Sequence, residues 1–310
     1  MPCGWLLNRR LGRKVWKTLL AVQQIRRMRG GAQGHLMLGA DGKLWVVKFQ
    51  NNPQHRRVLA NELLATRLAA AAGLTVPETA VVEVSQWLIE NTPALEIDLG
   101  RTRVRCESGL QFGARYMGGT MPGQVVDYLA EEELLEIRNL GEFAGILALD
   151  KWTDNANGRQ AVFVRKARER RYTACFIDQG YCFHAGEWRF EDVPLRGVYP
   201  RNCVYAGIRG WACFEPWLTR METMDAAVVW RAAEEIPPEW YGGDMGELEV
   251  LVEKLMARRG RIRELIEAFR MSDREPFPNW VHVGKRSGTR GPRELKGTTM
   301  VGSLWQPRVN

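Results

Sequence analysis

One carboxylate in this chain stands where a buried strand is expected to end. Asp178 closes the apolar run of residues 174–177, and Gly180 follows shortly after it. Asp and Gly often end a strand at an ordinary turn. A carboxylate fixed at the end of a core strand can equally hold a divalent cation such as Mg²⁺. Position alone leaves both interpretations open, so the decision depends on the partners that the chain supplies.

A lysine in an apolar run is the first candidate partner. Lys48 lies in the segment LWVVKF, residues 44–49. Strand alternation places it on the face opposite Val47 and Phe49. Because lysine is rarely buried without a partner, this side chain either points to water at a sheet edge or reaches an anionic ligand.

A glycine-rich segment and a helical glutamate flank this lysine in the sequence. Before the strand, the candidate residues are Gly30, Gly31, Gln33 and Gly34. Glycines let backbone N–H groups approach anionic oxygens without interference from a Cβ atom, although they also form plain turns. After the strand, apolar spacing predicts a helix from Val58 to Gly73. Glu62 lies at the edge of its apolar stripe, where it either forms an ordinary helix pair or holds Lys48.

The polar loop DKWTDNANGRQ, residues 150–160, offers side chains for an acceptor and a metal ion. Its candidates are Asp154, Asn155, Asn157 and Gln160. Asp154 could accept a proton, whereas an amide such as Asn157 can orient a hydroxyl but cannot take its proton. The other two amides could join Asp178 around a divalent cation.

Phosphoryl transfer is the chemistry that needs these residue types together, because it depends on positioning and charge neutralisation more than on covalent steps. A backbone loop covers the phosphates, a lysine reaches them, and an acid holds the lysine. A polar loop and a carboxylate serve the acceptor and Mg²⁺. The chain presents these parts in the order used by the N-lobe of a protein kinase.

Two stretches resemble the HipA-like kinase family: DGKLWVVKFQNNPQHRRVLANELLATRLAAAAGLTVPE, and ALDKWTDNANGRQAVF followed by FIDQGYCF. The resemblance runs over most of residues 20–220. It implies a distant branch of the protein-kinase-like fold, with features shared by phosphoinositide kinases, and the use of ATP and Mg²⁺. By position, it implies that Lys48 contacts the ATP phosphates, Glu62 holds Lys48 and Asp178 binds the metal. Residues 30–34 take the phosphate-loop position without a G-x-G-x-x-G motif.

The resemblance is incomplete in the polar loop. The family pattern there is N-x-D followed within a few residues by Asn, with the Asp as base, whereas this chain has Asn155-Ala156-Asn157 and then Gln160. Two functions follow from this difference. The first is an ATP- and Mg²⁺-dependent phosphotransferase of the HipA-like type that phosphorylates Ser or Thr of a protein. The alternative is a nucleotide-binding pseudokinase that acts as a regulatory or scaffolding module.

The expected architecture is α+β, with a two-lobed, protein-kinase-like fold. We expect a kinase domain over residues 1–271, with a β-rich N-lobe at about 15–125 and a mainly helical C-lobe at about 126–271. Residues 272–310 are expected to form a basic, loosely ordered tail. The elements expected are hairpins around 39–43 and 161–177, an irregular stretch at 100–125, and helices at 131–149, 215–224, 225–235 and 247–269.

Composition limits the possible partners. The net charge is +8, but the basic residues gather at both ends of the chain, so we expect solvated surface and no nucleic-acid partner. The six cysteines are scattered without a C-x-x-C pair, which argues against zinc and disulfides and for a reducing compartment. No signal-peptide core or membrane span is visible, so we expect a cytoplasmic protein. Its expected partners are ATP and an acceptor of unknown identity, expected to be a protein.

Overall fold

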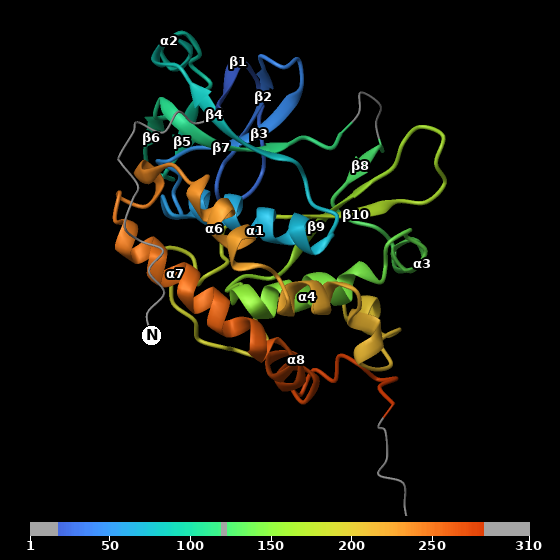
Figure 1. Cartoon of the computed structure of the whole chain (residues 1–310). Coiled ribbons are helices and arrows are strands. Elements are labelled where there is room, and N and C mark those ends of the chain that lie inside the picture. The colour runs from blue at the N-terminus through green and yellow to red at the C-terminus, as the bar shows by residue number, and fades with distance from the viewer. Residues whose placement is uncertain (1–17, 119–122, 282–310) are drawn as a thin grey trace, which may run out of the picture. The chain divides into compact units, whose positions relative to one another are not determined.

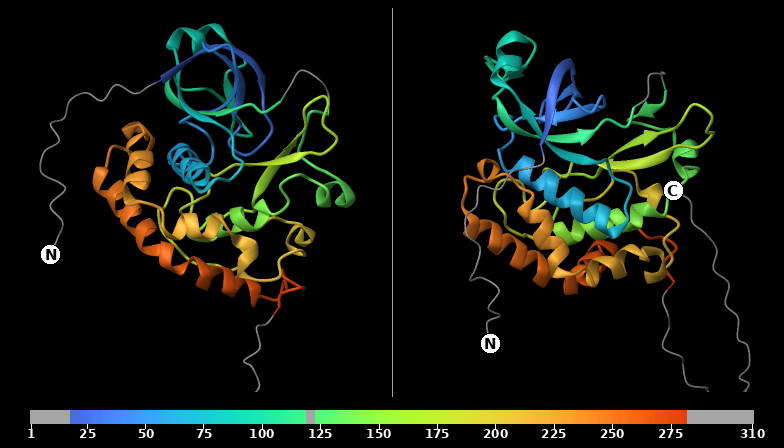
Figure 2. Two further views of the ribbon diagram at one scale, coloured as in Figure 1. Left: turned by 45° about the vertical axis from the view of Figure 1, so that its right-hand side comes forward. Right: turned by 45° about the horizontal axis from the view of Figure 1, so that its top comes forward.

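The structure is a computed structural model that describes residues 18–118 and 123–281. The first part forms a closed barrel in the order β1-β2-β3-β7-β4, at the top of Figure 1 and nearly end-on in the left view of Figure 2. Parallel pairing of β1 with β4, with Thr18 opposite Val81, closes the barrel. The strands are β1 (Thr18–Arg27), β2 (His35–Gly39), β3 (Leu44–Lys48), β4 (Thr79–Val84) and β7 (Gly109–Arg115).

The second part is mainly helical and carries a small sheet in the order β10-β9-β8. The remaining strands are β5 (Glu96–Asp98), β6 (Arg103–Arg105), β8 (Val125–Val126), β9 (Gln160–Val164) and β10 (Thr173–Ile177). In both parts together, the described α-helices are α1 (Val58–Ala72), α2 (Gln86–Asn91), α3 (Glu131–Leu135), α4 (Glu142–Thr153), α5 (Trp217–Glu222), α6 (Ala226–Glu234), α7 (Met245–Arg258) and α8 (Ile262–Arg270). Within the described ranges, no helix has the length and apolar character needed to cross a membrane.

The β2–β3 hairpin expected around residues 39–43 is confirmed. Leu38 pairs with Leu44, and Gly42 has φ 73° in the turn between them, a conformation that glycine adopts without strain. Val47 and Phe49 are buried in the barrel core, while Lys48 is only partly buried. The alternation of β3 therefore directs Lys48 away from that core.

Helix α1 confirms the helix expected from Val58 to Gly73. Gly73 has φ 84°, and its N–H reaches the carbonyl oxygens of Ala69 and Ala70, which ends the helix. Residues on every face of α1 are buried, as in a helix that lies inside a core. It contacts β4 and β7 as well as α4, α5 and α6, and in Figures 1 and 2 it lies between the barrel and α4.

Two expectations about the middle of the chain are wrong. The stretch expected to be irregular at residues 100–125 contains strands β6 and β7, and β7 completes the barrel between β3 and β4; Gly109 and Gly113 within β7 concealed the strand. The single helix expected at 131–149 is instead α3 and α4. Asn139, between them, accepts from the N–H of Ala174 at 2.8 Å and donates to its carbonyl at 2.9 Å, so this segment serves as a neighbour of β10.

The C-terminal helices also differ in detail from the expectation. The helix expected at 247–269 is broken by a 3-10 turn at Arg259–Arg261. Beyond α8, Phe277 is buried and stacks on Trp280, and the described residues up to Trp280 belong to one compact unit. The domain boundary at residue 271 stays a prediction. Most of the expected tail, from residue 282, lies outside the described residues.

The β9–β10 hairpin expected from the sequence is confirmed, and its register decides the position of the candidate metal ligand. Gln160, the first residue of β9, pairs with Ile177, the last residue of β10. Asp178 therefore follows directly at the end of the hairpin where the polar loop enters it.

The core position of α1 is testable through Leu64, which is fully buried. Leu64→Ala should lower the free energy of unfolding by about 2–5 kcal/mol, because the truncation leaves a cavity. Leu195→Ala, at a side chain that is 51% exposed, should change it by less than about 0.5 kcal/mol. Equilibrium denaturant unfolding measures both, and equal effects would contradict the placement of α1 in the core.

Candidate active site

Three charged side chains from distant segments meet at one point. Lys48 extends from the end of β3 and forms ion pairs with Glu62 of α1 and with Asp178, its Nζ lying 2.8 Å from Asp178 Oδ1. The side chains are 14%, 4% and 22% exposed, respectively. The structure therefore brings together the lysine, its helical acid and the candidate metal ligand predicted from the sequence.

The charges of this group follow from burial and proximity. Burial alone would lower the pKa of Lys48, but the carboxylates of Glu62 and Asp178 raise it well above its usual range. Burial would raise the pKa of Asp178, but the Lys48 ammonium holds it below its ordinary value. Burial raises the pKa of Glu62 despite the ammonium beside it. At neutral pH, Lys48 is therefore charged and Asp178 is ionised.

The glycine-rich segment lies against the lysine. A Cβ atom on Gly34 would stand 3.0 Å from the carbonyl oxygen of Val47 and 3.6 Å from Lys48 Cγ. A Cβ on Gly31 would stand 2.6 Å from the side-chain nitrogen of Gln54. Gly34 thus lies beside the stem of Lys48, whereas Gly31 lies against the side chain of Gln54.

The other two residues of this segment have separate roles. Gly30 has φ 124° and forms the turn. Gln33 also has positive φ, and its side chain binds the backbone of Asp98, accepting from the N–H at 2.8 Å and donating to the carbonyl at 2.6 Å. Gln33 therefore ties the segment to β5 and directs its own amide away from Lys48.

Of the two amides expected near the metal, Gln160 contacts Asp178. Its Nε2 donates to Asp178 Oδ2 at 2.7 Å. Asn155 is buried and bonds within the polar loop, since it donates to Asp150 Oδ1 at 2.9 Å and accepts from the N–H of Asn157 at 3.1 Å. The geometry favours Gln160 over Asn155 as a companion of Asp178.

The donor set at Asp178 fits a metal ion that arrives with a nucleotide. In residues 18–118 and 123–281, no group of three or more His, Cys, Asp or Glu side chains could hold a metal by itself. Mg²⁺ is usually bound in nucleotide sites by one or two carboxylates, with phosphates and water completing its shell. Asp178 is one such carboxylate, and the side-chain amide of Gln160, which contacts it, carries a further oxygen that can serve as a ligand.

The two candidates for the acceptor side lie in different surroundings. Asp154 is 5% exposed, caps α4 with φ 48°, and accepts a hydrogen bond of 2.6 Å from the N–H of Glu191. Asn157 is exposed, and its Oδ1 accepts from the N–H of Gly158 at 2.8 Å. The structure thus gives Asp154 a bracing contact and leaves the amide of Asn157 at the surface.

A buried lysine, Lys151, binds residues 194–196 next to the polar loop of residues 150–160. Lys151 is 6% exposed and donates to the carbonyl oxygens of Pro194 at 2.7 Å and Arg196 at 2.6 Å. Burial lowers its pKa to about 8, although the nearby carboxylates of Asp150 and Asp154 act in the opposite direction. Lys151 therefore fixes residues 194–196 next to the polar loop.

Sequence reasoning missed three buried polar residues at the site: Asn61, Arg159 and Gln179. Asn61 donates to the carbonyl oxygens of Gly180 at 2.8 Å and Ala185 at 2.7 Å and accepts from Trp188 Nε1 at 2.8 Å. A Cβ on Gly180 would stand only 2.6 Å from Val58 Cγ1. The segment after Asp178 is therefore held closely against α1. The adjacency of Asn61 to Glu62 was the only signal for it in the sequence.

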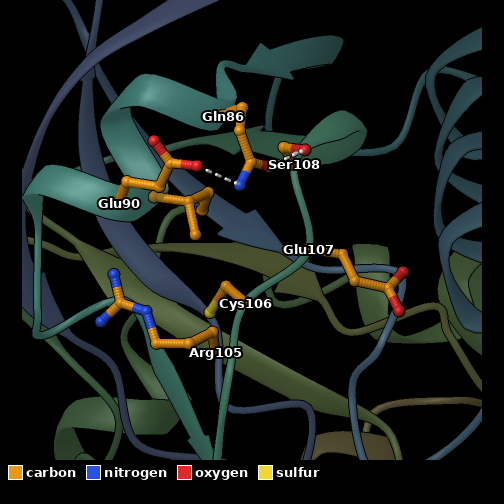
Figure 3. A pocket seen from close by; sticks show the side chains of 7 residues that line it. Gln86, Glu90, Arg105, Cys106, Glu107 and Ser108 are labelled. Carbon is orange, nitrogen blue, oxygen red and sulfur yellow. Dashed lines mark hydrogen bonds between the residues drawn. The ribbon is translucent and has the colours of Figure 1, made fainter.

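A cavity of about 520 Å³ opens elsewhere, between α2 and residues 105–108 (Figure 3). Its polar side chains satisfy one another, because Ser108 donates to Gln86 at 2.8 Å and Gln86 donates to Glu90 at 2.8 Å. Burial raises the pKa of the Cys106 thiol to about 12, which keeps it protonated. None of the residues predicted for the site lines this cavity, so the candidate active site is the Lys48 group.

Part of the chain matches a known protein family. Residues 21–161 match the family model described as HipA-like kinase, which confirms the resemblance seen in the sequence. No curated protein matches the chain.

Solved structures are similar to this chain at low sequence identity. Hydra Fam20 aligns with TM-score 0.50 and 9% identity, covering 84% of this chain and 88% of its own. The proinflammatory kinase CtkA of Helicobacter pylori gives TM-score 0.47 and 11% identity, covering 77% and 95%. The toxin–antitoxin complex of HipA, HipB and operator DNA from Shewanella oneidensis gives 0.39 and 13%, covering 84% and 70%. The predicted α+β, two-lobed, protein-kinase-like fold is confirmed.

The lowered pKa of Lys151 predicts a rise in stability at alkaline pH. Between its folded pKa of about 8 and the unfolded value near 10.4, the unfolded chain binds the additional proton, so the free energy of unfolding rises with pH. The rise is at most about 1.4 kcal/mol per pH unit for one group. Denaturant unfolding at pH 7–10.5 should show this rise in the wild type relative to Lys151→Met. A constant difference between the two proteins would contradict the assignment.

Proposed function

We propose that this chain, whose residues 21–161 match the HipA-like kinase family, is an ATP- and Mg²⁺-dependent phosphotransferase. Lys48 steadies the phosphates, and Glu62 holds Lys48 in place. The backbone of residues 30–34 covers the phosphates, and Asp178 with Gln160 holds the metal, which neutralises phosphate charge. Asn157 orients the acceptor hydroxyl.

The contact of Lys48 with both Glu62 and Asp178 carries this proposal. The three residues come from the barrel, from α1 and from the end of β10. An ammonium next to an ionised carboxylate, with Gly34 beside its stem, provides one group for phosphate oxygens and one for a divalent cation. An ordinary surface lysine or a plain turn at Asp178 would not require this convergence.

The acceptor that we propose is the hydroxyl of Ser or Thr in a protein, and the setting that we propose is the cytoplasm. The support for the acceptor is the family resemblance, which is an argument by analogy. Asn157 lies at the surface, where a polypeptide can reach it.

A second candidate function, a nucleotide-binding pseudokinase, is favoured by one observation. The base position carries Asn157, and the nearby acid Asp154 is 5% exposed and bound to the N–H of Glu191. An amide cannot accept the proton of an acceptor hydroxyl. In this alternative the chain binds ATP as a regulatory or scaffolding module without turnover.

Incubation with γ-labelled ATP and Mg²⁺ separates the two functions. We expect label transfer to protein in the wild type and its loss in Asp178→Ala, because the metal would lose its carboxylate. Lys254→Ala, which changes an exposed side chain of α7, should leave transfer intact. Thermal stabilisation by ATP without any transfer would support the pseudokinase, and the absence of both effects would exclude both functions.

Restoring a carboxylate at the base position tests the role of Asn157. If Asn157 orients the acceptor, Asn157→Asp should increase the rate of transfer about tenfold or more, since a positioned general base contributes about 10²–10⁴-fold. Asp154→Asn should retain both transfer and thermal stability, because the amide oxygen can still accept the hydrogen bond from the Glu191 N–H. Initial rates at saturating ATP measure both variants. Loss of transfer in Asp154→Asn without loss of stability would instead identify Asp154 as the base.

A further inference from the structure

A buried polar junction lies beside the candidate metal ligand. Gln179, which follows Asp178 in the chain, is fully buried. Its backbone N–H donates to Glu62 Oε2 at 3.0 Å, and its side-chain oxygen accepts a hydrogen bond from Arg159. Its side-chain nitrogen donates to the carbonyl of Phe176 at 3.3 Å. Gln179 thus joins α1 to the polar loop through a single residue.

Arg159 binds the residues on both sides of the candidate metal ligand, through the backbone of Ile177 and the side chain of Gln179. Its Nη1 donates to the carbonyl oxygen of Ile177 at 2.8 Å as well as to the side chain of Gln179. The rest of the guanidinium pairs with Asp150, where Nε donates to Oδ2 at 2.9 Å and Nη2 binds Oδ1. Arg159 and Asp150 are 1% exposed, so the pair is anchored inside the molecule.

The backbone of Asp178 needs such support. Its φ is 63°, in the left-handed region that residues other than glycine rarely adopt. Such a conformation persists only where the surrounding structure over-determines it. The hydrogen bonds of Ile177 and Gln179 to one guanidinium provide this constraint, and they set the direction in which the Asp178 carboxylate leaves the chain.

We infer that Arg159, acting through Gln179 and Ile177, is the positioning residue that aims Asp178 at a divalent cation bound with the nucleotide. The inference rests on the proposed nucleotide function. Asp150 fixes the guanidinium, the guanidinium fixes the backbone around Asp178, and that backbone presents Asp178 Oδ2 next to Gln160. The polar loop and the metal ligand are therefore set in place by the same buried cation.

Gln179→Met is the sharpest variant for this inference. Replacing Arg159 would leave Asp150 as an unpaired buried charge, which can unfold the protein by itself. Gln179→Met keeps the ion pair with Asp150 and the side-chain length, and it removes one acceptor of Arg159, the side-chain oxygen of residue 179. Gln111→Met is the matched control, because Gln111 is also fully buried and bonded to backbone, accepting from Gln50 N–H at 2.8 Å.

Two measurements on the full chain read the positioning. Amide hydrogen exchange of the ligand-free protein reports the backbone of residues 176–182. Calorimetric titration with ATP, with and without Mg²⁺, reports how much the cation tightens binding. In Gln179→Met, we expect faster amide exchange in residues 176–182. We also expect Mg²⁺ to strengthen ATP binding about tenfold less than in the wild type, which is the usual effect of losing a hydrogen bond to a charged group. ATP affinity without Mg²⁺ and both properties of Gln111→Met should match the wild type.

The outcomes separate this inference from the proposed function. If Mg²⁺ enhances ATP binding equally in the wild type and in Gln179→Met, the positioning role is wrong while the nucleotide function stands. If exchange rises equally in Gln111→Met, the effect is general loosening and the inference is also wrong. If Mg²⁺ has no effect on the wild type, the proposed function fails and the positioning role fails with it.

Discussion

The candidate site depends on one ammonium group held between two carboxylates. Lys48 comes from β3, Glu62 from α1 and Asp178 from the end of β10. A charge in a poorly solvated place is stable only with such partners, and removal of one partner leaves an uncompensated charge. The barrel, the central helix and the β9–β10 hairpin therefore cannot move apart without breaking an ion pair.

Helix α1 extends this constraint into the core. Glu62 and its neighbour Asn61 are both buried, and they bind the segment after Asp178 through Gln179, Gly180 and Ala185. Apolar residues on the remaining faces of the helix pack against the barrel and the helices. Burial of α1 thus supports both the charge state of Lys48 and the path of the chain beyond Asp178.

The two sides of the candidate site differ in how many of the expected functional groups they contain. On the proposed nucleotide side, Asp178 contacts both the Lys48 ammonium and the Gln160 amide, and Gly34 lies beside the stem of Lys48. On the proposed acceptor side, the amide of Asn157 stands in the position proposed for the base, and the nearby acid Asp154 braces a neighbouring segment. Because phosphoryl transfer has a loose transition state, the lack of a base is expected to slow the reaction more than to prevent it.

Local patterns in the sequence were sufficient for several elements. Alternation in LWVVKF gave the face of Lys48, Asp-Gly gave the β2–β3 hairpin, and apolar spacing with a terminal glycine gave α1. They failed for β7, where Gly109 and Gly113 resemble a loop, and for the break between α3 and α4. That break depends on the hydrogen bond between Asn139 and Ala174 of β10, which lie 35 residues apart in the sequence. The spacing of apolar residues along a helix carries no information about such a distant partner.

By itself, the sequence determined the residue types that are proposed for the phosphates and the metal and the order in which the chain presents them. Only the tertiary structure decided that Lys48, Glu62 and Asp178 share one point, that Asp154 braces Glu191, and that Arg159 binds the residues on either side of Asp178. The physical reason is that hydrophobic period and turn chemistry act over a few neighbouring residues. A buried polar side chain, in contrast, is specified by partners that folding brings from distant parts of the chain.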